Sequence, residues 1–280
     1  MQLSTKNHDR DAVGMLYVYP VVSRRAGGVS VGINLNPNNA CNWHCAYCQV
    51  PDLKRGVAPE IDLIVLHDEL HCLLADIVDG DFMLQHVPEA CRKLCDVAIS
   101  GNGEPTSCSQ FDAVVRVIVD VMQSFHLSVP LRLITNGSYV HKQHVHAGLA
   151  LMAEHHGEVW VKVDSVTDAG IQRINGVSLN QARLRQQVEA VAAVCPTWIQ
   201  TCMLSWQGKP PEESEITAYL AFLQALKSDA VDIHGVLLYG LARPSMQDES
   251  VYLTALDAEW MAMMAERIRR QSSLDVKLSL

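Results

Sequence analysis

The chain has 280 residues, of which 49% are hydrophobic and 19% charged, and its formal net charge is −9. A chain of this length allows two average domains or a single α/β barrel. The apolar content supports a large core, which excludes a disordered chain and a disulfide-stapled mini-protein. The acidic balance gives no strong nucleic-acid signal, because nucleic-acid-binding domains are typically basic.

The cysteine content and the N-terminus indicate the compartment. Residues 1–14 are polar and lack the apolar stretch of a secretory signal. No apolar run reaches the roughly 18 residues that a membrane helix needs. Nine cysteines in such a chain favour a reducing environment, where clustered thiols are metal ligands or catalysts rather than cross-links. We therefore expect a cytoplasmic protein with no membrane association.

Short β-branched runs alternate with longer segments of helical periodicity along the chain. The predicted strands are 29–35, 97–101, 131–136, 159–165, 198–204 and 231–239. Several are continuously apolar, as expected for strands that are buried on both faces. Apolar residues recur at spacings of three and four within 63–77, 184–191 and 216–226, which predicts helices there. Pro210 and Pro211, followed by Glu212, predict the start of the last of these.

This order of elements predicts the fold class. Six β/α units in series imply a parallel sheet with right-handed crossovers. We predict α/β class with a partial (β/α)6 TIM-like barrel, because a full eight-unit barrel typically needs about 250 residues and the early units hold long excursions. A doubly wound open sheet is the alternative. We expect an irregular N-terminal segment over residues 1–28 and one domain over 29–280.

Three of the nine cysteines lie within eight residues, directly after the first predicted strand. Cys41, Cys45 and Cys48 have the spacing C-x3-C-x2-C in an Asn-rich segment that predicts a loop. In a β/α architecture this loop opens at the carboxyl edge of the sheet, where ligands bind. Three thiolates supply three ligands to a [4Fe–4S] cluster and leave one iron open. A zinc site that recruits His44 is the competing interpretation, although adjacency to Cys45 is unlike the usual zinc-ligand spacing.

A second candidate element follows the next predicted strand. Gly101, Asn102, Gly103 and Glu104 precede Pro105 in the pattern G-x-G-E-P. Two glycines permit close backbone approach to a ligand, and the glutamate could pair with an ammonium group. The third glycine of a dinucleotide fingerprint is absent. An ordinary strand-to-helix turn is the alternative interpretation.

The two elements together resemble the radical S-adenosylmethionine (SAM) superfamily. The triplet has an aromatic residue, Tyr47, before its last cysteine. Further segments extend the likeness to the radical SAM Fe–S oxidoreductases related to wyosine-synthesis proteins. These segments are 19–25, 134–138, 161–164 and 238–244, in the right order along the chain.

The resemblance implies a set of cofactors and their ligands. Cys41, Cys45 and Cys48 would bind a [4Fe–4S] cluster whose fourth iron is chelated by SAM. Reduction of the cluster would cleave SAM to methionine and a 5′-deoxyadenosyl radical that abstracts hydrogen from a substrate. An electron donor such as flavodoxin or ferredoxin is implied. The resemblance therefore implies an iron-dependent oxidoreductase of unidentified substrate.

The resemblance also assigns roles around SAM. Glu104 would pair with the methionine ammonium, within the stretch Gly101, Asn102 and Gly103. Asn136 and Asp164 fall at strand ends where the family holds the carboxylate or ribose. Tyr47 would lie near the adenine. Helix capping is the alternative role for Asn136 and Asp164.

Three arginines are candidates for substrate binding. Arg24, Arg25 and Arg243 flank the open end that the resemblance implies, and arginine forms bidentate pairs with phosphate or carboxylate. If they converge, an anionic substrate is favoured; surface salt bridges are the alternative. Two other functions stay open: a non-catalytic iron–sulfur or zinc scaffold, and a wyosine-like tRNA-modifying enzyme.

Overall fold

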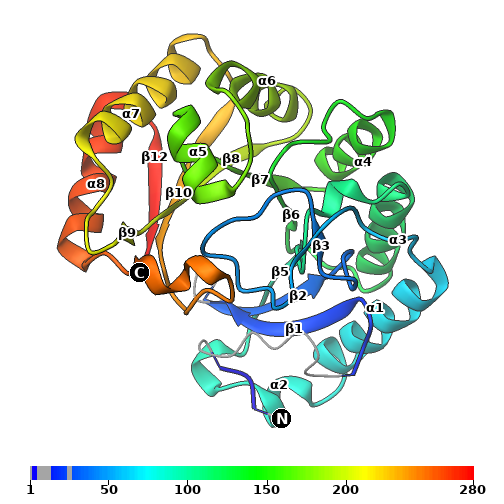
Figure 1. Ribbon diagram of the computed structural model, residues 1–280. Helices are drawn as coiled ribbons and strands as arrows, with labels where there is room; N and C mark the ends of the chain where they lie inside the picture. The colour runs from blue at the N-terminus through cyan, green and yellow to red at the C-terminus, as the bar shows by residue number, and fades with distance from the viewer. Residues whose placement is uncertain (1, 5–13, 24–26) are drawn as a thin grey trace. The chain divides into compact units, whose positions relative to one another are not determined.

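The computed structural model describes residues 2–4, 14–23 and 27–280 (Figure 1). Its chain divides into two compact units. The first comprises Met1–Cys41, Gly56–Thr135 and Tyr139–Glu158, and the second comprises Asn42–Arg55, Asn136–Ser138 and Val159–Leu280. Two substrate candidates, Arg24 and Arg25, lie outside the described residues.

The first unit contains four strands of the main sheet in the order β1-β2-β5-β6. Strand β1 is antiparallel to β2, whereas β2, β5 and β6 are parallel. The strands are β1 (Val18–Ser23), β2 (Gly28–Ile33), β5 (Leu94–Ile99) and β6 (Leu131–Thr135), with a short β3 (Ala40–Cys41). The helices are α1 (Leu63–Val78), α2 (Phe82–His86), α3 (Phe111–Ser124) and α4 (Gln143–Glu154), with 3-10 turns η1 (Glu89–Cys91) and η2 (Pro105–Ser107).

Apolar periodicity explains the packing of the first unit. Helix α3 packs against both α1 and α4 (Figure 1). Leu66 and Leu70, one helical turn apart on α1, and Ile118 of α3 are all fully buried. The side chain of Asp62 caps α1 by accepting from the backbone N–H groups of Ile64 and Val65.

The second unit contains four further strands in the order β7-β8-β10-β12. Strand β8 is parallel to β7 and to β10, and β10 is parallel to β12. The strands are β7 (Glu158–Lys162), β8 (Thr197–Met203), β10 (Ile233–Gly240) and β12 (Asp275–Ser279), with short strands β4 (Lys54–Arg55), β9 (Ser205–Trp206) and β11 (Leu253–Thr254). The helices are α5 (Asp168–Asn175), α6 (Gln181–Ala192), α7 (Glu213–Ser228) and α8 (Ala258–Ser272), with a 3-10 turn η3 (Asp248–Tyr252).

Two contacts between elements organise the second unit. Strand β9 follows β8 and pairs antiparallel with β11. Helices α7 and α8 pack against each other (Figure 1), and an ion pair joins Glu213 to Arg267 across them. Helix α7 begins at Glu213 with acidic residues in its first turn, as the sequence predicted.

All six predicted strands are present within a few residues of their expected bounds, as β2, β5, β6, β7, β8 and β10. The prediction of α/β class with a partial TIM-like barrel of mostly parallel strands is confirmed. The expectation that residues 1–28 are irregular is wrong for Val18–Ser23, which form β1. That strand escaped detection because it contains Pro20, a residue tolerated mainly in edge strands.

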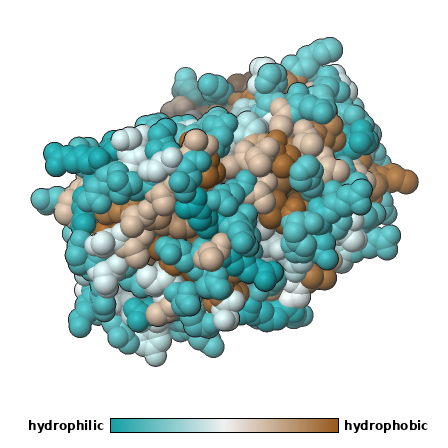
Figure 2. Space-filling model, turned by 90° about the horizontal axis from the view of Figure 1, so that it is seen from above, coloured by the Kyte–Doolittle hydropathy of each residue, from teal (hydrophilic) through white to brown (hydrophobic). Residues whose placement is uncertain are grey.

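The surface and the helices bear on the membrane prediction. None of the helices in the described part of the chain has both the length and the apolarity needed to cross a membrane. In the space-filling view, hydrophobic side chains are interspersed with hydrophilic ones on the face shown (Figure 2).

Candidate functional site

The cysteine loop is shared between the two units: Cys41 belongs to the first, and Cys45 and Cys48 belong to the second. All three are free, half-buried thiols, and none of the nine cysteines forms a disulfide. The donor set therefore fits a metal cluster in chemistry and in partial exposure. Among residues 2–4, 14–23 and 27–280, no three or more His, Cys, Asp or Glu side chains are grouped closely enough to hold a metal ion.

In the first unit, the Gly101–Glu104 element packs tightly against the segment that precedes Cys41. A Cβ on Gly103 would lie 2.0 Å from the Ala40 carbonyl oxygen, and a Cβ on Gly101 would lie 2.3 Å from Asn34 Oδ1. The backbone N–H of Asn102 donates to Asn34 Oδ1 at 3.0 Å. The glycines are thus required by the approach of the protein's own backbone, whether or not a ligand also approaches there.

Glu104 is buried and held in a fixed orientation. Its Oε1 accepts hydrogen bonds from the Thr106 backbone N–H at 3.1 Å and from the hydroxyls of Thr106 and Thr135. The side chain is only 2% exposed and caps the 3-10 turn η2. Burial, the charge of Glu104 and that of Cys41 all raise the pKa of Tyr139. Glu104, the candidate partner of the ammonium group, and Cys41, a candidate cluster ligand, thus both influence the pKa of Tyr139 within this unit.

An acceptor in the same unit lacks a partner. Asn36 is 1% exposed, and its Nδ2 donates to the Ala40 carbonyl at 2.9 Å. Its Oδ1 is buried without a hydrogen-bond partner in the described part of the chain. A buried amide oxygen without a partner is costly, so a donor from a bound group would stabilise it.

In the second unit, Asp164 is the centre of a buried polar cluster. Its side chain is fully buried. Oδ1 accepts from the Cys202 backbone N–H at 2.8 Å, and Oδ2 accepts from the Tyr47 hydroxyl at 2.6 Å and from Asn175 Nδ2 at 2.7 Å. The N-cap of the following helix α5 is Thr167, so Asp164 is not a helix cap.

Lys162 supplies the counter-charge to Asp164. Its Nζ lies 3.8 Å from Asp164 Oδ2 and donates to the Tyr47 hydroxyl. Burial acts to lower the pKa of Lys162, but Asp164, Tyr239 and the thiols of Cys45 and Cys202 together outweigh it and hold that pKa well above the ordinary value. Lys162 is therefore charged at neutral pH, and this cluster combines a paired cation and anion with a phenol.

The same cluster reaches the cysteine loop. Asn175 Nδ2 lies 3.5 Å from Cys45 Sγ and donates to it. Burial raises the pKa of Cys45 to about 12. The Cys45 thiol consequently keeps its proton at neutral pH unless a metal ion replaces that proton.

The remaining predicted residues of the second unit have local partners. Asn136 donates to Asn42 Oδ1 at 2.8 Å and accepts from the Ser138 backbone N–H at 3.0 Å. Arg243 Nη1 donates to Gln49 Oε1 at 3.2 Å. Gln49 directly follows Cys48 in the chain. His44 is the residue that a zinc site would recruit, and its Nε2 lies 3.7 Å from Glu249 Oε2.

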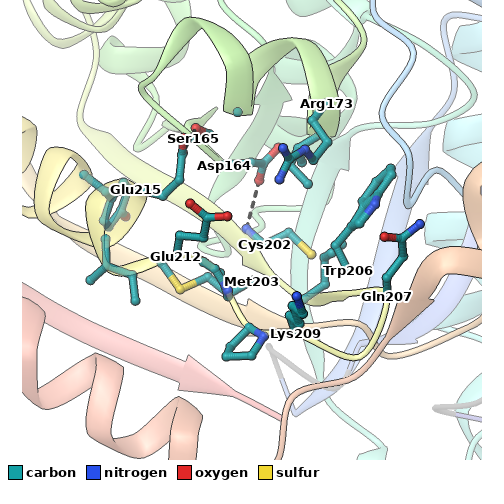
Figure 3. A pocket seen from close by; sticks show the side chains of 17 residues that line it. Asp164, Ser165, Arg173, Cys202, Met203, Trp206, Gln207, Lys209, Glu212 and Glu215 are labelled. Atoms are coloured by element: carbon teal, nitrogen blue, oxygen red, sulfur yellow. Dashed lines mark hydrogen bonds between the residues drawn. The ribbon is translucent and has the colours of Figure 1, made fainter.

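A cavity of about 330 Å³ lies beside Asp164 in the second unit (Figure 3). Its walls come from the segment after β7, from α5, from the end of β8 and from the segment that leads into α7. Glu215 fixes one wall by accepting from the hydroxyls of Ser165 and Thr167. Arg173 and Lys209 also line the cavity, and neither side chain has an acceptor partner among the described residues.

Sequence reasoning missed several members of this site. Lys162 lies within a segment that supported the resemblance, yet no role was predicted for it. Asn175 carries no sequence signal, because it is simply the last residue of α5. Cys202 lies outside the cysteine triplet, and no role was predicted for it. The only available signal for it was its position at the end of a predicted strand.

Solved structures with the same fold include SuiB from Streptococcus suis bound to S-adenosylmethionine. The TM-score is 0.59 and the identity 13%, over 89% of this chain and 50% of SuiB. TYW1 with a lysine–pyruvate adduct gives a TM-score of 0.57 and 16% identity, over 97% of this chain and 80% of that one. A radical SAM methyltransferase from Sphaerobacter thermophilus gives 0.58 and 11%, over 90% of this chain and 66% of that one. The chain thus has the fold of radical SAM enzymes, and the predicted resemblance is confirmed at the level of the fold.

The sequence comparisons identify no family for this chain. No protein-family model matches the chain. A curated protein, the GTPase Obg of Brachyspira hyodysenteriae, is 26% identical over 135 residues, which are 47% of this chain and 17% of that protein. The chain contains no G-x4-G-K-[ST] phosphate-binding loop, the usual sequence signature of a P-loop GTPase.

Proposed function

We propose that this protein is a radical SAM enzyme. One observation carries the proposal: a C-x3-C-x2-C loop follows β2 in a chain whose fold is that of SAM-bound SuiB over 89% of its length. Cys41, Cys45 and Cys48 would hold a [4Fe–4S] cluster. With SAM bound, the cluster supplies reductive cleavage to a 5′-deoxyadenosyl radical, which abstracts hydrogen from a substrate.

The chain's own residues would bind and orient SAM. The fixed carboxylate of Glu104 offers an anion for the methionine ammonium, since its Oε1 is already held by two threonines. Asn36 Oδ1 offers an acceptor that lacks a partner in the described residues. The pair of Lys162 and Asp164 fixes Tyr47 next to the last cysteine of the triplet.

An anionic group on the substrate would meet two cations in the cavity of the second unit, whose lining also includes the carboxylates of Asp164, Glu212 and Glu215. Arg173 and Lys209 line it, and both are cations with no acceptor among the described residues. Arg243, the candidate that the structure describes, is held beside the cysteine loop by Gln49. We propose that these cations orient a carboxylate or phosphate, and substitution of Arg173 by Gln should raise KM more than it lowers kcat.

The proposal includes a partner and a compartment. The cluster would need a one-electron donor, such as a flavodoxin or ferredoxin. Nine free thiols are consistent with a reducing cytoplasm.

A wyosine-type tRNA-modifying enzyme is the second candidate within the same chemistry. The observation that favours it is the structural match to TYW1, which spans 97% of this chain and 80% of TYW1. The net charge of −9 disfavours it, because RNA binding draws on basic surfaces. A non-catalytic metal-binding scaffold is disfavoured by the retention of Glu104 beside a complete cysteine triplet.

The test is anaerobic reconstitution with iron and sulfide, followed by reduction with dithionite and addition of SAM. We expect about four irons per chain, as one cubane cluster requires, and formation of 5′-deoxyadenosine. Cys45→Ala should lose both cluster and product, whereas Cys195→Ala, a buried cysteine outside the triplet, should keep both. A zinc-loaded, iron-free protein that leaves SAM intact would show that the proposal is wrong.

A further inference from the structure

Cys202 is a buried thiol on the wall of the cavity in the second unit. It is the penultimate residue of β8 and is 3% exposed. Cys108 and Cys195 are equally buried, but they do not line this cavity. In Figure 3, Cys202 lies among the side chains around the cavity, beside Asp164. Cys202 is not one of the proposed cluster ligands, so the proposed function assigns no role to this thiol.

A chain of hydroxyl groups connects this thiol to the buried carboxylate. Tyr239 on β10 is the register partner of Cys202 on β8, and its side chain packs against the cluster that contains Cys202. The Tyr239 hydroxyl donates to the Tyr47 hydroxyl at 3.5 Å, and the Tyr47 hydroxyl donates to Asp164 Oδ2 at 2.6 Å. The apolar surroundings include Ala46, Leu204 and Leu253. A thiol and two phenols thus follow one another in a largely apolar environment.

The protonation of the thiol suits hydrogen-atom chemistry. Burial and the charge of Asp164 raise the pKa of Cys202. The group therefore keeps its proton at neutral pH, so it carries an S–H bond and is a poor ionic nucleophile. An S–H bond is weaker than most C–H bonds, and a phenolic O–H bond is comparable in strength to S–H. Transfer of a hydrogen atom from this thiol to a carbon radical is therefore favourable, and exchange between thiol and phenol is nearly balanced.

We propose that Cys202 is a hydrogen-atom donor to carbon radicals formed in this cavity and that Tyr239 restores its thiol. This inference rests on the proposed radical SAM function. In the first step the S–H bond breaks and a C–H bond forms, which leaves a sulfur-centred radical on Cys202. In the second step Tyr239 gives its phenolic hydrogen atom to that sulfur and becomes a phenoxyl radical. The phenoxyl regains one electron from the ferredoxin- or flavodoxin-type donor and one proton from solvent.

The test uses SAM alone as the probe, in ²H₂O. Thiol and hydroxyl hydrogens exchange with this solvent, whereas C–H hydrogens do not. Without another substrate, a radical on the 5′ carbon takes hydrogen from the nearest weak bond. We expect the reconstituted, dithionite-reduced protein to release 5′-deoxyadenosine with one deuterium, as measured by mass spectrometry.

Two substitutions at Cys202 and one matched control separate the alternatives. In Cys202→Ala and in Cys202→Ser, the deuterated fraction should fall to background. Serine keeps an exchangeable hydrogen and nearly the same size, but the alcohol O–H bond is too strong to be abstracted. Cys195→Ala, equally buried but away from the cavity, should match the unmodified protein.

A spectroscopic readout tests the relay independently of product. Samples frozen during SAM cleavage should show a phenoxyl radical by electron paramagnetic resonance, narrowed when tyrosine is ring-deuterated. The signal should be lost in both Tyr239→Phe and Cys202→Ser. A signal that persists in Cys202→Ser would overturn the relay.

The deuterium content of the product tests the role of Cys202, whereas the total amount of 5′-deoxyadenosine tests the proposed function. Equal deuterium in the unmodified protein and Cys202→Ser overturns the role of Cys202 and leaves the proposed function standing. Absence of 5′-deoxyadenosine from the reconstituted, unmodified protein overturns the proposed function, and this inference with it.

Discussion

Asp164 shows how single residues of the second unit are held in place. Its carboxylate has no solvent exposure, so its charge must be balanced within the protein. Three hydrogen bonds and the ammonium of Lys162 supply that balance. Breaking a buried pair by removing one partner leaves an uncompensated charge, and this costs more than loss of a surface pair.

Lys162→Met should therefore destabilise the protein by about 3–5 kcal/mol, the usual cost of breaking a buried pair. Urea unfolding of the metal-free protein measures it. Asp164→Asn added to Lys162→Met should recover part of the loss, because the buried carboxylate is then gone. Lys227→Met, at the exposed end of α7, is the control and should change stability little.

The pH dependence follows from the direction of the Lys162 pKa. A pKa raised in the folded state gives stability that is fully present below the unfolded-state pKa and is lost as pH rises through the folded-state pKa. The difference between the unmodified protein and Lys162→Met should thus stay constant from neutral pH to the ordinary lysine pKa of about 10.4. A difference that vanishes between pH 7 and 9 would contradict the buried-pair interpretation.

At the scale of elements, the turn after β5 packs against the segment after β2 so closely that a Cβ atom on Gly101 or Gly103 would overlap with that segment. Ala40 and Asn36 lie where a Cβ on Gly103 would project. Because the atoms involved include a backbone carbonyl, neither element can yield by a simple rotamer change. This contact places the Glu104 turn against the segment that leads to Cys41 in the first unit.

Gly103→Ala should destabilise the protein by about 1–3 kcal/mol, as overpacking of tight sites does, and should lower iron retention after reconstitution. Gly240→Ala provides the matched control, since its added Cβ would find its nearest neighbour, Met261 Cε, at 3.9 Å. Urea unfolding and iron analysis measure the two effects. Equal stability of the two variants would show that the close contact is absent in solution.

At the scale of the whole molecule, nine thiols are distributed over both units without a disulfide. Cys108, Cys195 and Cys202 are buried, and the other six are half-buried or exposed. A reducing compartment and a cluster-binding role both require that these thiols stay free.

Thiol titration of the metal-free protein tests that state. In denaturant we expect nine reactive thiols per chain. Under native conditions the three buried thiols should react far more slowly than exposed Cys72, because reagent access requires local opening. Seven thiols in denaturant, which is nine minus the two in one disulfide, would contradict the structure.

Much of the fold could be predicted because its signals are local. Short β-branched runs, several of them continuously apolar, identified β2, β5, β6, β7, β8 and β10, since strands buried on both faces need little more than such side chains. Strand β12 was missed because Asp275–Ser279 is an edge strand with only partial burial. The division into one N-terminal segment and one domain stays a prediction.

The candidate site was only partly predictable. The cysteine triplet and the Gly101–Glu104 element are contiguous patterns, so spacing alone revealed them. The partners of Asp164 are not contiguous with it, since Tyr47 lies 117 positions away and Cys202 lies 38 positions away. No local pattern encodes such a pairing.

The sequence by itself determined six of the strands and their order along the chain, the cysteine spacing and the resemblance that these carry, because each depends on neighbours along the chain. The tertiary structure decided which polar groups are buried together: Glu104 with its two threonines, Asp164 with Lys162 and Tyr47, and Cys202 with the cavity. The reason is desolvation. A buried polar group must find its partner wherever folding brings one, and only the folded chain specifies that place.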